Sequence, residues 1–526
     1  MPDCETVFSK ACSEISQNLL SVSLPSKKEV KSEIKKICAK YSLERIPGNH
    51  EILAMVDGTD FSKLRKVLLK RPIKTASGVA IVALMPKPFA CPHGRCTYCP
   101  GGIEFNTPNS YTGKEPATIN AIENHYDPKI QILTKLDKLL AFGHERSKLE
   151  LVIVGGTFLF MPKNYQEDFI KSCFDALNGF DSDSLEDAKK NNETSKIRNV
   201  GFTIETKPDY CKEEHVDAML EYGVTRVEIG VQCLQERVYR IVNRGHDFQD
   251  VVQSFQISKD SGYKIVAHMM PGLPTMTPND DVKDFKQLFD DERLKPDMLK
   301  IYPSLVIENT PLYKDYKSGK YTPYSSEDMI KVLTEMKKSV PRWVRIMRVQ
   351  REISPSEIVA GPKLGNLRQI VHKNLKSQGL SCKCIRCREI GLSQDSHHDL
   401  KLKRDDYLSS GGKEVFLCYE NSNDSIFGFL RLRNPSLKAH RKEISERTCI
   451  VRELHVYGKS LKLGERSDTG IQHLGLGKKL LSEAEKISKE EFDANKLLVI
   501  SAVGTREYYR KFGYSLQGPY MAKKLA

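Results

Sequence analysis

The segment 79-VAIVALMPKPFACPHGRCTYCPGG-102 joins a continuous apolar stretch to a loop that carries three cysteines. Cys91, Cys96 and Cys99 follow the spacing C-x4-C-x2-C. Three thiolates on one loop can bind three irons of a [4Fe–4S] cluster, which leaves the fourth iron open to a small molecule. Because the C-x2-C arm fits zinc equally well, the rest of the chain has to decide between the two metals.

Further apolar runs follow this first one, and amphipathic stretches separate them. They cover 149–156, 199–206, 226–233, 264–271 and 298–305. Such a pattern is typical of an α/β fold whose parallel sheet is covered on both faces. It predicts an incomplete (β/α)6 barrel over 76–360, with its chemistry at the carboxyl ends of the strands. Polar or glycine-rich residues stand at those ends, where we expect them to meet: Gly155-Gly156-Thr157, Glu205, Gln232, His268 and Tyr302.

The rest of the chain divides into three regions. Residues 396–526 have apolar runs at 414–420, 426–433, 449–458 and 496–504 and a helix opening near 475, which predicts a separate α+β domain. Residues 361–395 interrupt the strand–helix rhythm and carry Cys382, Cys384 and Cys387. Residues 1–75 are predicted to be helical and basic. The charged stretch 181–196 is predicted to be an exposed insertion.

Charge and cysteine content limit the classes of protein. The net charge of +14 suits a polyanionic partner such as nucleic acid. No window reaches about 18 uninterrupted apolar residues, and the first residues lack an apolar signal region. We therefore expect a cytoplasmic protein with no membrane span. In a reducing compartment its 14 cysteines serve as metal ligands and buried thiols rather than disulfides.

The N-terminal region carries two groups of basic residues beside apolar Val30, Ile34 and Ile37, which recur at helical spacing. A solvated helix face and a nucleic-acid-binding surface both fit this pattern. The basic residues are Lys27, Lys28, Lys31, Lys35, Lys36 and Lys40 in the first group, and Lys63, Arg65, Lys66, Lys70, Arg71 and Lys74 in the second.

The barrel region resembles the radical S-adenosylmethionine (radical SAM) enzymes, whose usual spacing is C-x3-C-x2-C. The resemblance implies a [4Fe–4S] cluster on Cys91, Cys96 and Cys99, with S-adenosylmethionine on the open iron. Gly155-Gly156 resembles the turn that receives the methionine amino group, and Glu205 stands where a carboxylate contacts the ribose. The interior of such a barrel keeps a radical away from water.

A glycine-rich turn, 472-QHLGLG-477, opens the predicted helix of the C-terminal domain. Backbone N–H groups at a helix N-terminus bind phosphate oxygens. With 451-VRELHVYG-458 and 504-GTREYYRKFGY-514, the turn resembles the acetyl-CoA-dependent N-acetyltransferases of the GNAT type. The resemblance implies acetyl-CoA contacts, with Tyr509 near the thioester and one of Tyr508 and Tyr509 serving only to pack. The other contacts would be Glu453, Leu454, His455 and Val456 along the pantetheine arm, and Leu476, Gly477 and Lys478 at the pyrophosphate.

A radical SAM barrel followed by an acetyltransferase domain on one chain resembles the family of the catalytic subunit of the Elongator complex and its single-chain archaeal and bacterial relatives. This wider resemblance covers about 75–526 and includes 110-SYTGKEPA-117, 204-IETKPDYC-211 and 508-YYRKFGYSLQGPYM-521. It implies a tRNA wobble uridine (U34) acetyltransferase. A deoxyadenosyl radical would activate the acetyl methyl group of acetyl-CoA, and uridine would gain a carboxymethyl-type group at C5 (cm5U).

The same family resemblance extends to further residues and partners. Lys148 matches a lysine that contacts acetyl-CoA across the gap between the domains. The basic N-terminal region would bind tRNA at its anticodon stem-loop, whose wobble base has to leave the loop to reach the barrel. A homodimer and accessory Elongator-type subunits remain open as partners.

Cys382, Cys384 and Cys387 resemble the zinc site of the archaeal and bacterial members of this family. A closed zinc site needs a fourth ligand, for which His372, His397 and His398 are the candidates. Because eukaryotic members can lack these cysteines, their presence favours an archaeal-type, single-chain protein.

Three other functions compete with this interpretation. The chain could be a protein lysine acetyltransferase with a structural barrel, or a non-catalytic RNA-binding scaffold. Radical methylthiolation of tRNA is disfavoured, because Cys4, Cys12 and Cys38 are too dispersed to form a second cluster triad.

Overall fold

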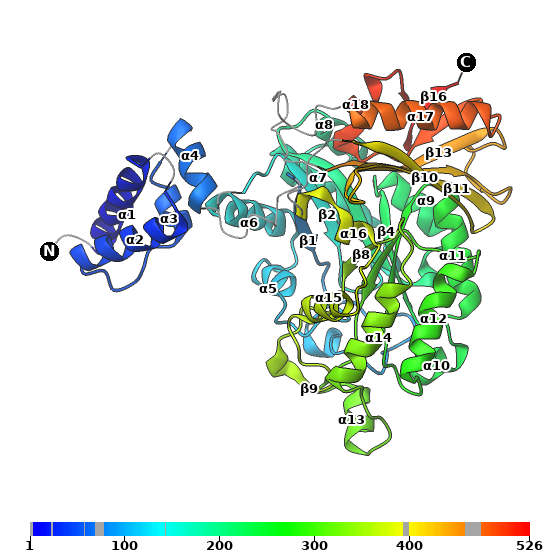
Figure 1. Ribbon diagram of the computed structural model, residues 1–526, viewed down its shortest axis with the longest axis horizontal. Coiled ribbons are helices and arrows are strands. Elements are labelled where there is room, and N and C mark those ends of the chain that lie inside the picture. Colours follow the sequence, from blue (N-terminus) through cyan, green and yellow to red (C-terminus); the bar gives the residue numbers. More distant parts are fainter. Residues whose placement is uncertain are drawn as a thin grey trace.

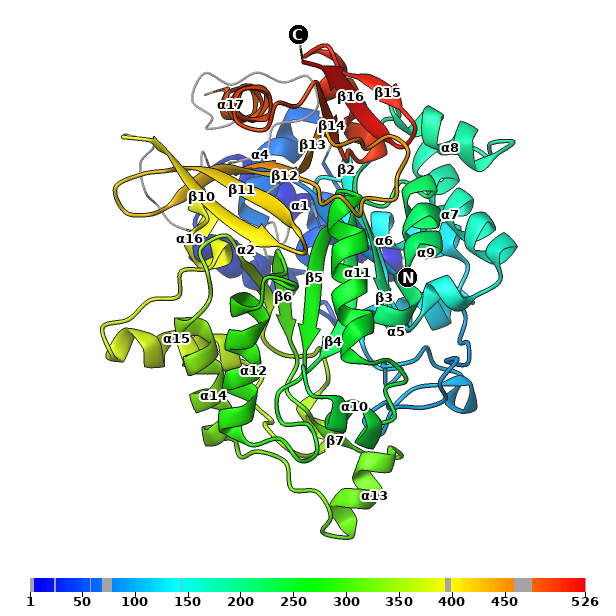
Figure 2. The same cartoon turned by 90° about the vertical axis from the view of Figure 1, so that its right-hand side faces the viewer.

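The computed structural model consists of a helical N-terminal lobe, a central barrel and a C-terminal sheet domain (Figures 1 and 2). It describes residues 4–22, 25–56, 58–68, 78–142, 144–392, 399–457 and 475–525. Among these residues, none of the helices combines the length and the apolar character that crossing a membrane requires.

The barrel is an open, all-parallel sheet. Its strands pair in the order β1-β2-β3-β4-β5-β6-β8. The strands are β1 (Ala80–Leu84), β2 (Lys148–Ile153), β3 (Arg198–Thr206), β4 (Arg226–Gln232), β5 (Lys264–Met269), β6 (Met298–Ile301) and β8 (Arg345–Arg348). The six predicted strands are confirmed. The sheet also has a seventh strand, β8, which the prediction lacked.

Helices cover the outside of this sheet (Figure 2). They include α6 (Pro128–Ala141), α7 (Lys163–Asn178), α8 (Leu185–Asn192), α9 (Glu213–Glu221), α11 (Phe248–Asp260), α12 (Pro278–Asp290) and α14 (Ser326–Lys338). Three other helices lie elsewhere: α5 (Pro116–Glu123) packs against inward-facing residues of β1 and β2, and α10 (Glu236–Ile241) and α13 (Pro311–Lys317) pack with Cys96 and Cys99 at the carboxyl ends of the strands. The segment that follows the barrel holds β9 (Ile358–Ala360), which pairs with β7 (Val306–Ile307), and then α15 (Leu367–Ser377) and α16 (Ile385–Arg388).

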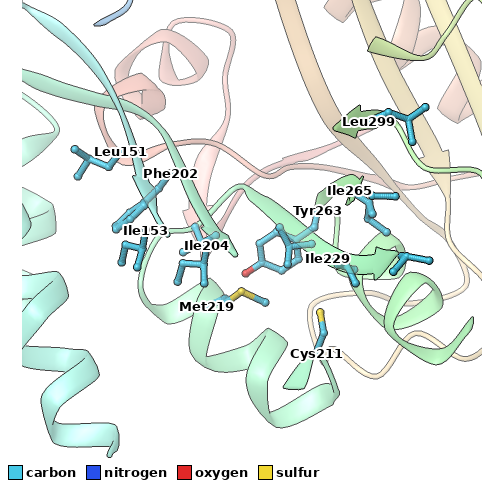
Figure 3. Close-up of a cluster of buried hydrophobic side chains, with 14 of the residues drawn as sticks. Leu151, Ile153, Phe202, Ile204, Cys211, Met219, Ile229, Tyr263, Ile265 and Leu299 are labelled. Atoms are coloured by element: carbon cyan, nitrogen blue, oxygen red, sulfur yellow. The ribbon is translucent and has the colours of Figure 1, made fainter. Parts of the chain in front are cut away.

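The main hydrophobic core lies between the strands and this helical layer. Alternate residues of each strand point outward into it, among them Leu151 and Ile153 of β2 and Ile204 of β3 (Figure 3). The intervening residue Val152 faces the inside of the barrel instead. Strands that are buried on both faces account for the continuous apolar runs in the sequence.

The N-terminal lobe lies beside α6 and has a core of its own (Figure 1). Its helices are α1 (Cys4–Leu20), α2 (Lys27–Lys40), α3 (Asn49–Leu53) and α4 (Gly58–Leu68). Ser26 and Glu29 form a capping box that starts α2. Val30, Ile34 and Ile37 are buried, which confirms the predicted helical spacing.

The C-terminal domain is a mixed sheet with the order β10-β11-β12-β13-β14-β16-β15. Its strands are β10 (Lys401–Ser409), β11 (Gly412–Glu420), β12 (Ile426–Asn434), β13 (Thr448–Val456), β14 (Lys496–Val499), β15 (Ser515–Gln517) and β16 (Tyr520–Lys524), and its helices are α17 (Leu476–Glu490) and α18 (Arg506–Arg510). The four predicted strands are confirmed, whereas β10, β15 and β16 were not predicted.

This domain covers the amino ends of the barrel strands. Arg452 reaches Asp297, just before β6, with contacts of 2.6 and 2.8 Å, and also contacts Glu414 of its own sheet at 2.9 Å. Arg433 contacts Asp260 at the end of α11 at 2.6 Å. These side chains are at most 1% exposed, so the interface is held by buried charge pairs.

The stretch 181–196 is not the exposed insertion that its composition predicted. It forms α8, whose Ala188 and Asn192 are fully buried. Glu193 then contacts Arg506 at 2.9 Å and Arg510 at 2.6 Å. The prediction was wrong because part of this charged stretch packs against distant residues: Glu193 pairs with two arginines of the C-terminal domain, and the buried Lys189 donates to the Glu221 carbonyl.

Candidate functional site

The cysteine loop lies at the carboxyl ends of the barrel strands, directly after β1. Cys96 and Cys99 are each 6% exposed, and Cys91 is half-buried. Neighbouring segments hold the loop: the Thr97 N–H donates to Val242 at 3.0 Å, and the Thr97 carbonyl accepts from Leu312 at 2.8 Å. The loop is therefore built into the wall of the barrel rather than free on its surface.

A cavity of about 370 Å³ fills the inside of the barrel. At the carboxyl ends of the strands its lining includes the three loop cysteines, Gly156, Thr157, Glu205, Gln232, His268 and Tyr302. The expected meeting of strand-end residues is thus confirmed for all of them except Gly155, which does not line this cavity. The cavity also reaches Arg226 and Arg345, which begin β4 and β8, so it spans the length of the barrel.

The Gly155-Gly156 turn brings backbone against the cavity wall. Both residues have positive φ angles, 114° and 113°, which favour glycine. A Cβ on Gly155 would lie 2.9 Å from Pro108, and one on Gly156 would lie 3.2 Å from Asn109. The chain therefore has no room for side chains at this turn, and Gly156 itself lines the cavity.

The three loop thiols fit a multi-iron cluster better than a single ion. One zinc ion brings its thiolates to about 3.8 Å from one another, as the Zn–S distance implies. In the described part of the chain, the sulfurs of Cys382, Cys384 and Cys387 lie within 4.8 Å of one another, but those of the loop cysteines form no such group. A cluster of four irons holds its ligands further apart, and a set of three thiols suits it.

A charged group lies deeper in the cavity. Glu228 of β4 contacts Lys300 of β6, and the Glu228 carboxylate lies 2.8 Å from His268 Nε2. Lys300 also lies 3.6 Å from Glu205. Burial alone would raise the pKa of Glu228, but Lys300 and His268 outweigh it and hold that pKa below its usual range. Burial would likewise lower the pKa of Lys300, but Glu228 outweighs it and raises that pKa.

Three of these residues, Glu205, Glu228 and His268, offer ligand atoms close enough for a metal ion. The ammonium group of Lys300 already neutralises Glu228, so these carboxylates have a positive partner without a metal ion. Sequence reasoning missed Glu228 and Lys300 because they stand inside apolar runs. The available signal was a lone charge in the middle of a strand buried on both faces, which needs a partner.

Arginines give the cavity a basic lining. Arg345, Arg348, Arg351 and Arg386 contribute to it. Arg348 is paired with Glu352 at 3.2 Å, whereas the guanidinium of Arg351 contacts the Ser110 carbonyl. Guanidinium groups that line a cavity suit the phosphate groups of a nucleic acid.

The second cysteine group lies between the barrel and the C-terminal domain. Cys384 Sγ is 3.4 Å from Cys387 Sγ, and His372 Nε2 of α15 is also 3.4 Å from Cys387 Sγ. Burial, with help from Lys337, lowers the pKa of His372 to about 4, so its imidazole is neutral at pH 7. Of the three candidate fourth ligands, His372 meets the cysteines, while His397 and His398 fall outside the described residues.

In the C-terminal domain, β13 and β14 diverge. They pair in parallel only from Thr448 to Val451, while β13 continues to Val456 beside β12. The predicted acetyl-CoA residues Glu453, Leu454, His455 and Val456 therefore have no strand on the β14 side in the described sheet. The Glu453 side chain is engaged by Arg431 at 2.8 Å, whereas the backbone of this stretch has no strand beside it on that side of the described sheet.

The start of α17 lies next to this open edge. Gly475 precedes it with a φ of 64°, and no side chain caps the helix. Leu476 and Gly477 are buried and Lys478 is exposed, while Gln472, His473 and Leu474 fall outside the described residues. A helix start without a side-chain cap favours an anionic ligand.

The two tyrosines of α18 differ in their surroundings. Tyr509 packs in the core of the C-terminal sheet, and burial raises the pKa of its hydroxyl. A Cβ on Gly477 would lie 2.6 Å from the Tyr508 hydroxyl, so this hydroxyl lies at the start of α17. The catalytic role predicted for Tyr509 stays a prediction, and Tyr508 is a second candidate for it.

Lys148 begins β2, at the barrel end that the C-terminal domain covers. Burial lowers the pKa of its ammonium group, and Glu145 opposes this shift. Its predicted contact with acetyl-CoA also stays a prediction.

Three segments of the chain match known protein families. Residues 8–76 match the ELP3 N-terminal domain, residues 86–288 match the radical SAM superfamily, and residues 296–377 match the radical SAM C-terminal domain.

Whole proteins are similar to the chain over nearly its full length. The tRNA uridine(34) acetyltransferase of Methanocaldococcus jannaschii is 46% identical over 491 residues, which cover 91% of the chain and 90% of that protein. Human Elongator complex protein 3 is 44% identical over 505 residues, which cover 93% and 92%. The solved structure of the archaeal Methanocaldococcus infernus Elp3, with an N-terminal deletion (1–46), superposes with a TM-score of 0.76 at 41% identity. It covers 86% of this chain and 100% of that chain.

Proposed function

Because the chain belongs to the family of Elongator complex protein 3 and the archaeal tRNA uridine(34) acetyltransferases, we propose that it modifies uridine 34 of tRNA. Acetyl-CoA supplies the two-carbon unit, S-adenosylmethionine supplies the radical, and the product carries a carboxymethyl-type group at C5. The observation that carries the proposal is that one chain joins a thiol-lined barrel cavity to a domain with an open strand edge and an uncapped helix.

Cys91, Cys96 and Cys99 would hold the [4Fe–4S] cluster, and the backbone of Gly156 with the Glu205 carboxylate would hold S-adenosylmethionine beside it. When bound, this pair supplies a carbon-centred radical through one-electron chemistry. The strands around that site would shield the radical from bulk water.

Lys300 is the residue of the barrel interior best placed to hold a reacting oxygen. Its ammonium group has three donors, of which one binds Glu228, while Glu205 lies 3.6 Å away as an ion-pair partner. A remaining donor would bind a carbonyl or enolate oxygen of a bound acyl group. Because Glu228 keeps Lys300 protonated, the donor is in place before the substrate arrives.

In the C-terminal domain, the open backbone of Glu453–Val456 would bind the amides of the pantetheine arm as an added strand does. The first N–H groups of α17, at Leu476, Gly477 and Lys478, would bind the pyrophosphate. Tyr508 or Tyr509 would donate a hydrogen bond to the thiolate that leaves.

A zinc ion on Cys382, Cys384, Cys387 and His372 completes the proposal. Three thiols and one imidazole form a closed tetrahedral set, which is typical of a structural rather than a catalytic zinc site. The ion would tie α15 and α16 together where the chain leaves the barrel for the C-terminal domain.

The N-terminal lobe would supply much of the affinity for tRNA. Lys28, Lys31 and Lys35 are exposed on α2, and no acidic partner faces them in the described lobe. A cavity of about 370 Å³ is too small for an anticodon loop, so the wobble base has to swing out of the stack to enter it.

The test uses the full chain, reconstituted anaerobically with iron and sulfide and supplied with unmodified tRNA, acetyl-CoA and S-adenosylmethionine. Nucleoside mass spectrometry should detect carboxymethyl-type uridine with the wild type and with Cys173→Ala, a buried thiol of α7. Cys96→Ala should abolish the product, and Tyr508→Phe and Tyr509→Phe should decide which tyrosine matters. No product from protein with an intact cluster would contradict the proposal. Acetylation of a histone peptide without S-adenosylmethionine or tRNA would favour a lysine acetyltransferase.

A further inference from the structure

The residues between the first two loop cysteines place a histidine against one of the ligands. His93 Nε2 lies 3.2 Å from Cys96 Sγ. The backbone around it is fixed, because the His93 carbonyl accepts a hydrogen bond from Asn243 at 3.2 Å. Gly245 packs against it so closely that a Cβ there would lie 2.3 Å from the His93 Cβ. The surroundings therefore aim the ring of His93 at Cys96.

A lysine decides which ring nitrogen of His93 carries the proton. Lys207 Nζ, from the end of β3, lies 2.9 Å from His93 Nδ1 and 3.0 Å from Asp209, which compensates its charge. Lys207 is only 3% exposed, so this geometry has little freedom. An ammonium group has donors and no acceptor, so Nδ1 has to accept. In the neutral ring the proton then sits on Nε2, the atom that faces Cys96.

We propose that His93 is a positioning residue that donates a hydrogen bond to the Cys96 thiolate and so makes the cluster easier to reduce. Reduction adds negative charge to the cluster and its sulfurs, and a donor on a ligand sulfur stabilises the more negative state. The inference rests on the proposed cluster, whose presence the test measures separately.

The other hydrogen-bond donors around the loop are distributed unevenly among the cysteine sulfurs. Arg244 Nη1 lies 3.8 Å from Cys96 Sγ, and its other nitrogen, Nη2, donates to the Gly230 carbonyl at 2.8 Å. Cys99 Sγ accepts from the Ser110 N–H at 3.2 Å. Cys96 is therefore the ligand with two side-chain donors in the described loop, and His93 is the nearer of the two.

The test is a redox titration of the full chain, reconstituted anaerobically and without S-adenosylmethionine. Electron paramagnetic resonance measures the reduced cluster at each potential, and iron and sulfide assays measure its content. His93→Phe keeps a ring and removes the donor, His93→Gln returns an N–H near the position of Nε2, and Lys207→Met removes the group that orients the ring. The control is His215→Phe on α9, whose neighbours are Lys212 and the Tyr210 ring.

At the potential where half the wild-type cluster is reduced, His93→Phe and Lys207→Met should lower the reduced-to-oxidised ratio about three- to tenfold, the value of one hydrogen bond. His93→Gln and His215→Phe should stay near the wild type. In the double variant His93→Phe/Lys207→Met, the reduced-to-oxidised ratio should be no lower than in His93→Phe alone, because Lys207 acts through His93.

An unchanged ratio in His93→Phe with full cluster content would overturn the proposal, and so would an equal loss in His93→Gln. If His93→Phe takes up no cluster, Lys207→Met decides, since it leaves His93 in place. A wild-type ratio in that variant overturns the proposal.

Discussion

At the scale of single residues, the barrel carries charge where its strands are otherwise apolar. Glu228 and Lys300 are 1% and 6% exposed and neutralise each other across β4 and β6. Runs of apolar residues predicted these strands correctly, but the apolar pattern did not single out the charged residues within them. By contrast, the loop cysteines, Gly156 and Glu205 stand at strand ends, where topology alone brings them together, so their meeting could be predicted from the sequence.

Replacing Lys300 with methionine should lower formation of the modified nucleoside about 100-fold, the effect of losing one preorganised donor at a reacting oxygen. Single-turnover assays with nucleoside mass spectrometry measure this, and cluster content should stay the same. Lys286→Met, an exposed lysine of α12, is the control. Wild-type rates in Lys300→Met would remove Lys300 from the reaction.

A buried carboxyl of α12 should make stability depend on pH. Burial raises the pKa of Asp281 to about 7, although Tyr324 and the Gly272 N–H oppose the shift. Between about pH 4 and pH 7 the folded chain keeps a proton that the unfolded chain releases, so this group's contribution to stability falls as pH rises through that window.

Asp281→Asn removes that titration. Its melting temperature relative to the wild type should therefore increase from pH 4 to pH 8, by an amount equivalent to at most about 4 kcal/mol. Thermal unfolding at a series of pH values measures the difference, with the exposed Asp290→Asn as the control. A difference that does not change with pH would contradict the assignment.

At the scale of elements, the sequence-based prediction of strands and helices failed where a segment's composition does not match its burial in the structure. Strand β8 has the sequence RIMR, with an arginine at each end, and is recognisable only from its pairing with β6. Strand β10, KLKRDDYLS, is an exposed edge strand with no apolar run. Helix α8 is followed by Glu193, whose carboxylate pairs with Arg506 and Arg510 of another domain. In each case the deciding contacts come from distant parts of the chain, which local patterns do not contain.

The link between the barrel and the C-terminal domain should hold zinc through α15 and α16. Elemental analysis after gel filtration should find about one zinc per chain, as a closed four-ligand site requires. His372→Ala and Cys384→Ser should lose it, whereas His440→Ala, whose histidine pairs with Asp217, should keep it. Full zinc content in His372→Ala would exclude His372 as the fourth ligand.

At the scale of the whole molecule, buried ion pairs fasten the C-terminal domain to the amino end of the barrel. Arg452 bridges Asp297 and Glu414, and Arg433 bridges Asp260 and Glu414. The sequence could not predict this interface, because its charges are scattered over almost 200 residues of chain between Asp260 and Arg452 and resemble surface charges.

Replacing Arg452 with methionine leaves two buried carboxylates without their main partner. The expected loss of stability is about 3–5 kcal/mol, as for other broken buried pairs. Thermal unfolding should show it as a clear fall in melting temperature. Arg447→Met, which breaks an exposed pair with Asp493, should have little effect. Equal effects of the two variants would mean that the interface is not held by these charges.

The same ion pairs affect the order in which the domains fold during translation. Asp260 and Asp297 leave the ribosome long before Arg433 and Arg452, which are their partners in the finished chain. Until the C-terminal domain has been translated and has docked, Asp260 and Asp297 at one end of the nascent barrel lack these arginine partners. Chains truncated before residue 430 should consequently be taken up by chaperones and proteases, even though every residue of the barrel is present.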